Sequence, residues 1–121
     1  MAKGREKHEA YQHALSLLGK DLARRAKSKC ELSGESGSLQ TVDLAPDDRS
    51  PTLDSTLLVQ SHIASWLDGA PFDDSEARFL ENAIWSEVPA VRTATRRLLQ
   101  RLVSDWAHDA LDSLNGWAPE E

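Results

Sequence analysis

The side chains that could support catalysis or bind a metal are few and widely spaced in this sequence. Cys30 is the one cysteine, and it lies beside Lys27 and Lys29, which leaves two interpretations open, a buried apolar side chain or a reactive thiol. No two of the four histidines have the i, i+4 spacing that places a ligand pair on one helix face. The sequence shows no nucleophile with its base, no phosphate loop and no metal site, and it therefore predicts a protein without enzymatic activity and without a cofactor.

Basic side chains are the clearest candidates for binding a partner. The arginines near residue 100 fall largely off the apolar stripe of the last predicted helix, where they would meet an acidic surface or a phosphate, or stay solvated. One tryptophan follows the predicted end of that helix and is a candidate interface residue, whereas we expect the other three to join helices in the core. The candidate partner-binding residues are Arg24, Arg25, Lys27, Arg96, Arg97, Arg101 and Trp117.

Charge is distributed unevenly along the chain. Residues 1–30 carry 8 basic and 3 acidic side chains, whereas residues 31–84 carry 2 basic and 11 acidic ones. A basic arm followed by an acidic segment can self-associate, bind a partner of mixed charge, or be solvated on opposite sides of the fold. The net charge of −6 disfavours a nucleic-acid-binding role without excluding it.

Length and hydropathy limit the architecture. The 121 residues fit one domain, 1–121. The sequence has no apolar run near the roughly 18 residues that cross a bilayer, so we expect no membrane contact and a cytoplasmic location. Within the domain we expect an N-terminal helix or helix pair over 1–29, a segment with a hairpin, loop and short helix over 30–69, and two helices over 70–116.

Hydrophobic periodicity places the elements. Apolar residues at helical spacing predict the first helix, with a kink or break at Gly19, and alternating residues 39–44 predict a strand that pairs with a second strand at 57–59. A short helix follows and ends at Gly69. Asp73 and Glu76 have the form of a capping box for a helix that reaches residue 85, and a last helix of roughly 40 Å begins after Ser86. The predicted fold class is therefore mostly α with a small β-hairpin, α+β.

Two segments, Arg24–Gly34 and Trp85–Leu111, resemble PhnA-type proteins, a family named for its association with alkylphosphonate utilisation genes. The first segment is similar to the family's entry into a zinc-binding knuckle. The second, with its Trp-Ser-Glu-Val-Pro-Ala-Val string, is similar to the helical segment that follows the knuckle. The resemblance spans residues 20–115 and implies a treble-clef or zinc-ribbon-like knuckle at residues 30–69, packed among helices.

The departures from the family pattern concern the metal. Where the family has two cysteine pairs, the matching positions here are Cys30, Ser33, Gln60 and Ile63. A serine hydroxyl and a glutamine amide are weak zinc donors and isoleucine has none, so we expect a degenerate, metal-free knuckle held by apolar packing. Family members usually continue into a C-terminal SH3-like barrel, which we expect to be absent here.

The missing catalytic groups and the lost metal ligands together predict a function without catalysis. We expect a PhnA-like protein, linked by family to phosphonate metabolism, that acts through protein–protein contacts, including a homodimer formed by its last helix. The alternative is a nucleic-acid or phosphate-binding accessory module that uses the basic N-terminal helix, whose binding should weaken steeply with salt.

Overall fold

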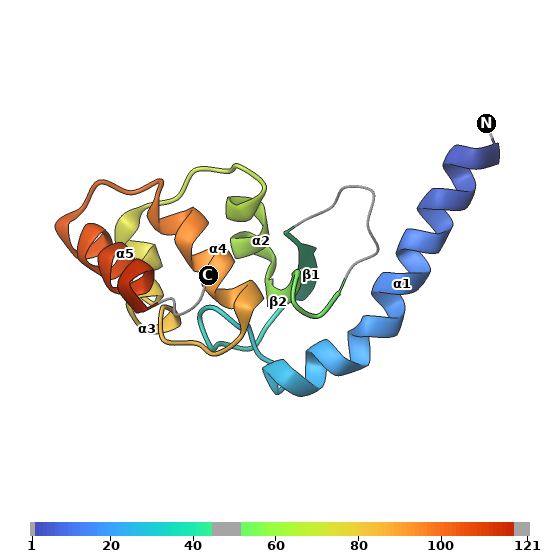
Figure 1. Ribbon diagram of the computed structural model, residues 1–121, viewed down its shortest axis with the longest axis horizontal. Coiled ribbons are helices and arrows are strands. Elements are labelled where there is room, and N and C mark those ends of the chain that lie inside the picture. The colour runs from blue at the N-terminus through green and yellow to red at the C-terminus, as the bar shows by residue number, and fades with distance from the viewer. Residues whose placement is uncertain (1, 45–51, 118–121) are drawn as a thin grey trace.

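The computed structural model describes residues 2–44 and 52–117, except for the side chains of residues 2–9, 11, 12, 14 and 117. The protein is elongated, with the first helix leaving one end and the C-terminal helices gathered at the other (Figure 1). The described residues confirm a mostly helical α+β fold with one small antiparallel hairpin. In chain order the elements are α1 (Ala2–Ala26), β1 (Leu39–Asp43), β2 (Thr56–Gln60), α2 (Ser61–Leu67), the 3₁₀ helix η1 (Asp74–Ala77), α3 (Leu80–Ala83), α4 (Pro89–Leu99) and α5 (Asp105–Trp117).

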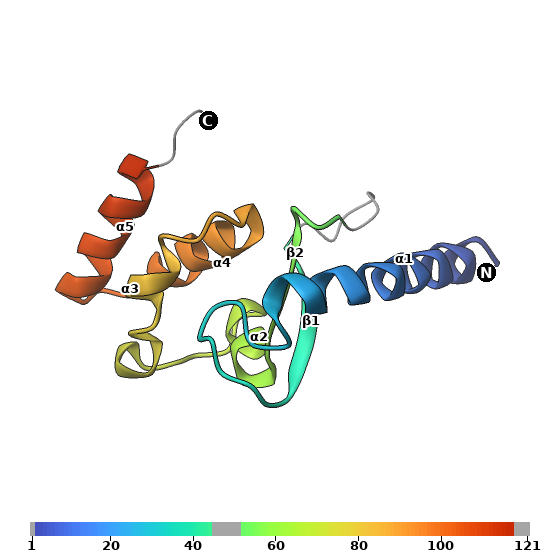
Figure 2. The same ribbon diagram turned by 90° about the horizontal axis from the view of Figure 1, so that it is seen from below.

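The hairpin joins the two ends of the molecule. Strands β1 and β2 pair antiparallel, with Leu39 opposite Gln60 and Asp43 opposite Thr56, which confirms the predicted pairing. Helix α2 contacts both strands, and the C-terminal part of α1 contacts β2. The two strands therefore stand between α1 and the helical body, as Figure 2 shows from below.

The core lies between the hairpin and helices α2 to α5. Leu57, Val59 and Ile63 are fully buried there, together with Leu98 and Leu99 of α4. The partly buried ring of Phe72 stacks on buried Trp66 with 4.6 Å between ring centroids, and Phe79 stacks at 6.1 Å. Apolar burial and ring contacts thus hold the helical body together.

Helix α2 ends as the sequence predicts. Gly69 has a φ of +112°, and its amide donates to the carbonyl of Trp66 while that of Ala70 donates to Ser65. This pair of bonds defines a Schellman motif, which favours glycine because a Cβ is strained at positive φ.

Helix α1 runs through Gly19 as one helix of 25 residues, so the expectation of two short helices is wrong. A glycine inside a helix costs about 1 kcal/mol relative to alanine, which does not outweigh continued backbone hydrogen bonding. The apolar stripe of α1 is only partly buried against the rest of the molecule. Leu22 is fully buried, whereas Leu15 and Leu18 are half-buried.

The predicted long last helix is also wrong, because residues 100–104 separate α4 from α5. The stripe that suggested continuity passes through Val103, which is 87% exposed. The break lets α5 turn back against α3 and α4, so that Ala107, Ala110 and Leu114 become buried. An unbroken helix would leave those apolar side chains in water.

The segment before α4 differs from the prediction in two respects. It forms two short helices, η1 and α3, and Asp73 makes no capping hydrogen bond with its side chain, so the capping box is wrong. Stacking of Phe72 and Phe79 on Trp66 draws this segment around one aromatic cluster instead. Trp85, expected in the core, is 55% exposed.

Candidate functional site

The segment that follows α1 forms a tight turn around Cys30. Lys27 and Ser28 have φ values of 57° and 60°, a left-handed conformation that reverses the chain after α1. The amide of Ser33 donates to Cys30 Sγ at 3.3 Å, and the amide of Gly34 donates to the Cys30 carbonyl at 2.9 Å. Cys30 is buried, so the structure favours the first of the two interpretations of this thiol.

A hydrogen bond between two side chains joins the turn to the hairpin. Both side chains are at positions that match metal ligands in the family pattern. Ser33 Oγ donates to Gln60 Oε1 at 2.7 Å, and Gln60 Nε2 approaches the Ser36 carbonyl at 3.5 Å. Ile63, in the first turn of α2, is fully buried in the same apolar cluster as Cys30. The structure therefore connects Cys30, Ser33 and Gln60 through hydrogen bonds and places Ile63 in the core.

These side chains do not fit a zinc ion. One thiol, one hydroxyl, one amide and one hydrocarbon supply a single strong donor where a structural site needs four. The two weak donors, Ser33 Oγ and Gln60 Oε1, are already bonded to each other. Within residues 2–44 and 52–117, no group of three or more His, Cys, Asp or Glu side chains could hold a metal ion.

Arg25, a candidate partner-binding residue, is engaged inside the molecule. Its Nε and Nη2 donate to the two carboxylate oxygens of Glu31 at 2.6 and 2.9 Å. The same guanidinium donates to the carbonyls of Leu53 and Thr56, each at 2.8 Å. Glu31 in turn accepts the amide hydrogen of Leu58 at 2.9 Å, so one ion pair ties α1 to both the turn and β2.

Sequence reasoning missed Glu31 and the internal role of Arg25. A signal was present, because Arg25 follows Leu18 by seven residues and Leu22 by three, which places it on the buried side of α1. A cation on that side needs a buried acceptor, and Glu31 is the first acid after the helix.

The three arginines near the end of α4 also bond within the chain. Arg96 Nε donates to Asn115 Oδ1 at 3.1 Å, and Arg97 Nη2 donates to the Leu44 carbonyl at 3.0 Å. Arg101 donates to the carbonyls of Trp66 and Ala70, at the C-terminal end of α2, and lies over the ring of Phe72 at 4.8 Å. A cation there complements the negative end of the helix dipole. The structure thus joins each of these arginines to another part of the body.

The remaining basic candidates lie at the surface beside α1. Arg24 and Lys27 are exposed, as are Lys20 and Lys29. Arg24 is joined to Asp21 at 3.6 Å, with 79% of the arginine side chain exposed. Trp117 is the last residue of α5, and its side chain lies outside the described residues.

A helix face that we call the outer face of α1 contains His13, Leu17, Lys20 and Arg24. Their spacing of four, three and four residues places them on one side of the helix, away from buried Leu22. Leu17 is 66% exposed, which is high for a leucine. The outer face therefore combines an apolar side chain with two cations.

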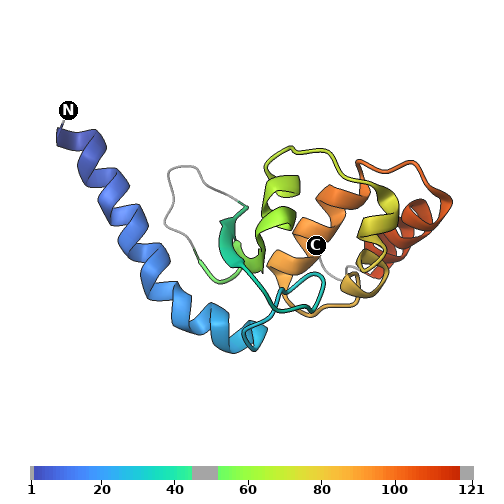
Figure 3. The same cartoon turned by 180° about the vertical axis from the view of Figure 1, so that it is seen from behind.

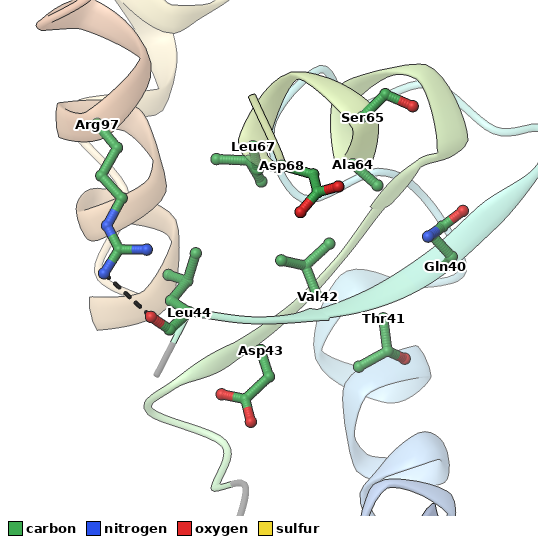
Figure 4. Close-up of a pocket in the computed structure, with 10 residues that line it drawn as sticks. All are labelled: Gln40, Thr41, Val42, Asp43, Leu44, Ala64, Ser65, Leu67, Asp68 and Arg97. Atoms are coloured by element: carbon green, nitrogen blue, oxygen red, sulfur yellow. Dashed lines mark hydrogen bonds between the residues drawn. The ribbon is translucent and has the colours of Figure 1, made fainter. Parts of the chain in front are cut away.

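Two pockets among the described residues lie beside candidate side chains. One pocket of about 390 Å³ lies between β1, α2 and α4 (Figure 4). Its acids, Asp43 and Asp68, point to opposite sides of β1, and its cation, Arg97, is held by the Leu44 carbonyl. A second pocket, of about 310 Å³, lies beside Cys30 and is lined by Lys27 and Lys29. In the second pocket the Cys30 thiol accepts the Ser33 amide hydrogen and the Glu31 carboxylate is bonded to Arg25, so the two groups have separate partners.

Comparison with known protein families, curated proteins and solved structures finds no match for this chain. Among the described helices, none combines the length and the apolar character that crossing a bilayer requires.

Proposed function

We propose that this chain is a cytoplasmic, non-enzymatic, PhnA-like protein that acts through protein–protein contacts, with the outer face of α1 as its docking surface. The family resemblance adds a role in phosphonate metabolism to the proposal. The degenerate knuckle in this proposal draws on the hydrogen bond between Ser33 and Gln60, which brings together two of the positions that match metal ligands in the family pattern.

The observation that carries the docking role is the position of α1. The helix leaves the body at the hairpin, and its N-terminal end lies far from α2 to α5 in the views from both sides (Figures 1 and 3). Leu17 stays 66% exposed on this projecting part. A projecting helix with an exposed leucine beside two cations offers one apolar anchor and two charged groups to the surface of a protein partner.

The alternative, a nucleic-acid or phosphate-binding module, draws on the same surface. Lys20, Arg24, Lys27 and Lys29 are all exposed and close in sequence. Against it stands the acidity of the whole chain, whose net charge is −6. The exposed leucine also gains nothing from a phosphate backbone.

A photo-crosslinking amino acid at position 17 tests the proposal in cells. We expect a covalent protein adduct from position 17, and no adduct when the same group replaces exposed Ser75 on η1, far from α1. Adding K20E/R24E to the position-17 protein should remove the adduct. An adduct that is nucleic acid, or retention of a 20-nucleotide RNA at about 50 mM salt that is lost at about 200 mM, would support the alternative and contradict the proposal. Absence of any adduct would also contradict it.

A further inference from the structure

We infer that the outer face of α1 binds the acidic face of α5 in a second copy of this chain. This inference rests on the proposed docking function and names its partner. It starts from α5, where Asp105, Asp109 and Asp112 are all exposed. Their spacing of four and three residues places them on one side of the helix, opposite buried Ala107 and Leu114. We call these three aspartates the acidic face of α5.

The exposed basic residues of α1 match part of this spacing. Lys20 and Arg24 are exposed and follow each other by four residues, as Asp105 and Asp109 do, and exposed Lys27 comes directly after the helix end at Ala26. The two pairs therefore have the same interval with opposite sign. Helices that lie side by side bring residues at such intervals to matching heights, so each cation can face one aspartate.

Both sets also have an exposed apolar neighbour on the N-terminal side. Leu17 precedes Lys20 and is 66% exposed, while Val103 precedes Asp105 and is 87% exposed. Each is among the most exposed large apolar side chains of the described residues. Contact between them would remove both from water at the same end of the paired helices.

The two faces cannot meet within one molecule, because α1 and α5 lie at opposite ends of it (Figures 1 and 2). Two elongated copies side by side in opposite directions bring each α1 to the other copy's α5. One such contact between short helices is small beside the roughly 1,200–2,000 Å² that stable interfaces bury. We therefore assign both contacts to a two-fold symmetric dimer, which forms them at once.

Charge reversal on each face tests the pairing by sedimentation equilibrium. We expect wild-type protein to reach twice the 13.4 kDa of the chain, with a dissociation constant that rises with salt. K20E/R24E and D109K/D112K should each raise that constant by about tenfold or more, because attraction becomes repulsion in both symmetric contacts. Asp105 is left in place, since a carboxylate in the first turn stabilises α5.

Mixing the two variants gives the decisive result. In one contact the acidic α1 of the first variant then faces the basic α5 of the second, and the other contact keeps the wild-type pairing of basic α1 with acidic α5. An equimolar mixture should therefore form heterodimers with an affinity near that of wild type. The control D73K/E76K makes the same charge change as D109K/D112K at the start of η1, where both side chains are exposed, and should leave dimerisation unchanged.

Three outcomes would overturn the inference. They are a monomeric wild-type protein at high concentration, no rescue on mixing, or a mass that keeps growing with concentration, which would indicate open chains. A monomer that still gives a protein adduct from position 17 would remove the second copy as partner and leave the docking function standing. A monomer that gives no adduct would remove both.

Discussion

Arg25 and Arg24 are neighbours in the sequence, yet they serve different purposes. The Arg25 side chain is 21% exposed and bonds to a Glu31 side chain that is 4% exposed, whereas the Arg24 side chain is 79% exposed. Hydrogen bonds from a guanidinium to a carboxylate and to two carbonyls satisfy nearly all of its donors. Removing Arg25 would therefore leave a carboxylate that is buried and has lost its counter-ion.

We expect R25M to lower the free energy of unfolding by about 2–4 kcal/mol, slightly less than the roughly 3–5 kcal/mol for breaking one side of a fully buried ion pair, because the Arg25 side chain is 21% exposed. Urea denaturation followed by tryptophan fluorescence measures this. In R25M/E31Q the amide oxygen can still accept the Leu58 amide hydrogen without a buried charge, so at least half of the loss should return. R24M is the matched control and should change stability by less than about 0.5 kcal/mol. Equal losses in R25M and R24M would contradict this assignment.

At the scale of elements, periodicity located the strands and most helices, but it could not show where an apolar stripe bends. The residues from Val91 to Ala110 continue one stripe in the sequence, and only the tertiary contacts of α5 with α3 and α4 explain the break at residues 100–104. The same reasoning applies to α1, where local preference at Gly19 favoured a break that the helix does not contain. Local preference is a weak guide when packing over longer range competes with it.

The candidate site shows a similar division between what sequence and structure can reveal. The ligand-matching positions were assigned from the family pattern, and the structure brings Ser33 of the turn to Gln60 at the end of β2. The sequence could not show that Arg97 and Arg101 bond to backbone carbonyls, because carbonyl positions depend on how α2 and β1 pack. The set of partner-binding residues predicted from the sequence therefore contains two kinds of arginine and lysine. Some bond within the molecule, and others are exposed at the surface.

If residues 30–69 are a degenerate knuckle, restoring the thiols should restore the metal. We expect S33C/Q60C/I63C, which adds three thiols to Cys30, to bind one zinc ion per chain and to melt at a higher temperature with zinc than with a chelator. Metal content by mass spectrometry and thermal unfolding measure both effects. The same variant carrying C30S has one thiolate fewer and should bind zinc more weakly. A folded triple variant that takes up no zinc would remove the knuckle proposal.

At the scale of the whole molecule, the structure separates a projecting helix from a body that holds the core. The part of α1 that the body uses is its C-terminal end, where Leu22 is fully buried and Arg25 bonds to Glu31. The outer face extends beyond that anchor, toward the N-terminal end that stands away from the body (Figure 3). This arrangement predicts that binding and folding depend on different parts of one helix.

Deleting parts of α1 tests that separation. We expect removal of residues 1–16 to change the free energy of unfolding by less than about 0.5 kcal/mol, because Leu22 and Arg25, which anchor α1 to the body, lie beyond the cut. Removal of residues 1–26 should cost about 4 kcal/mol or more, since it takes away the buried leucine and leaves Glu31 without its guanidinium. Chemical denaturation of both truncated chains and the full chain gives these values. A large loss from the shorter deletion would show that the N-terminal half of α1 is part of the folded body, and the docking surface would then have to be sought elsewhere.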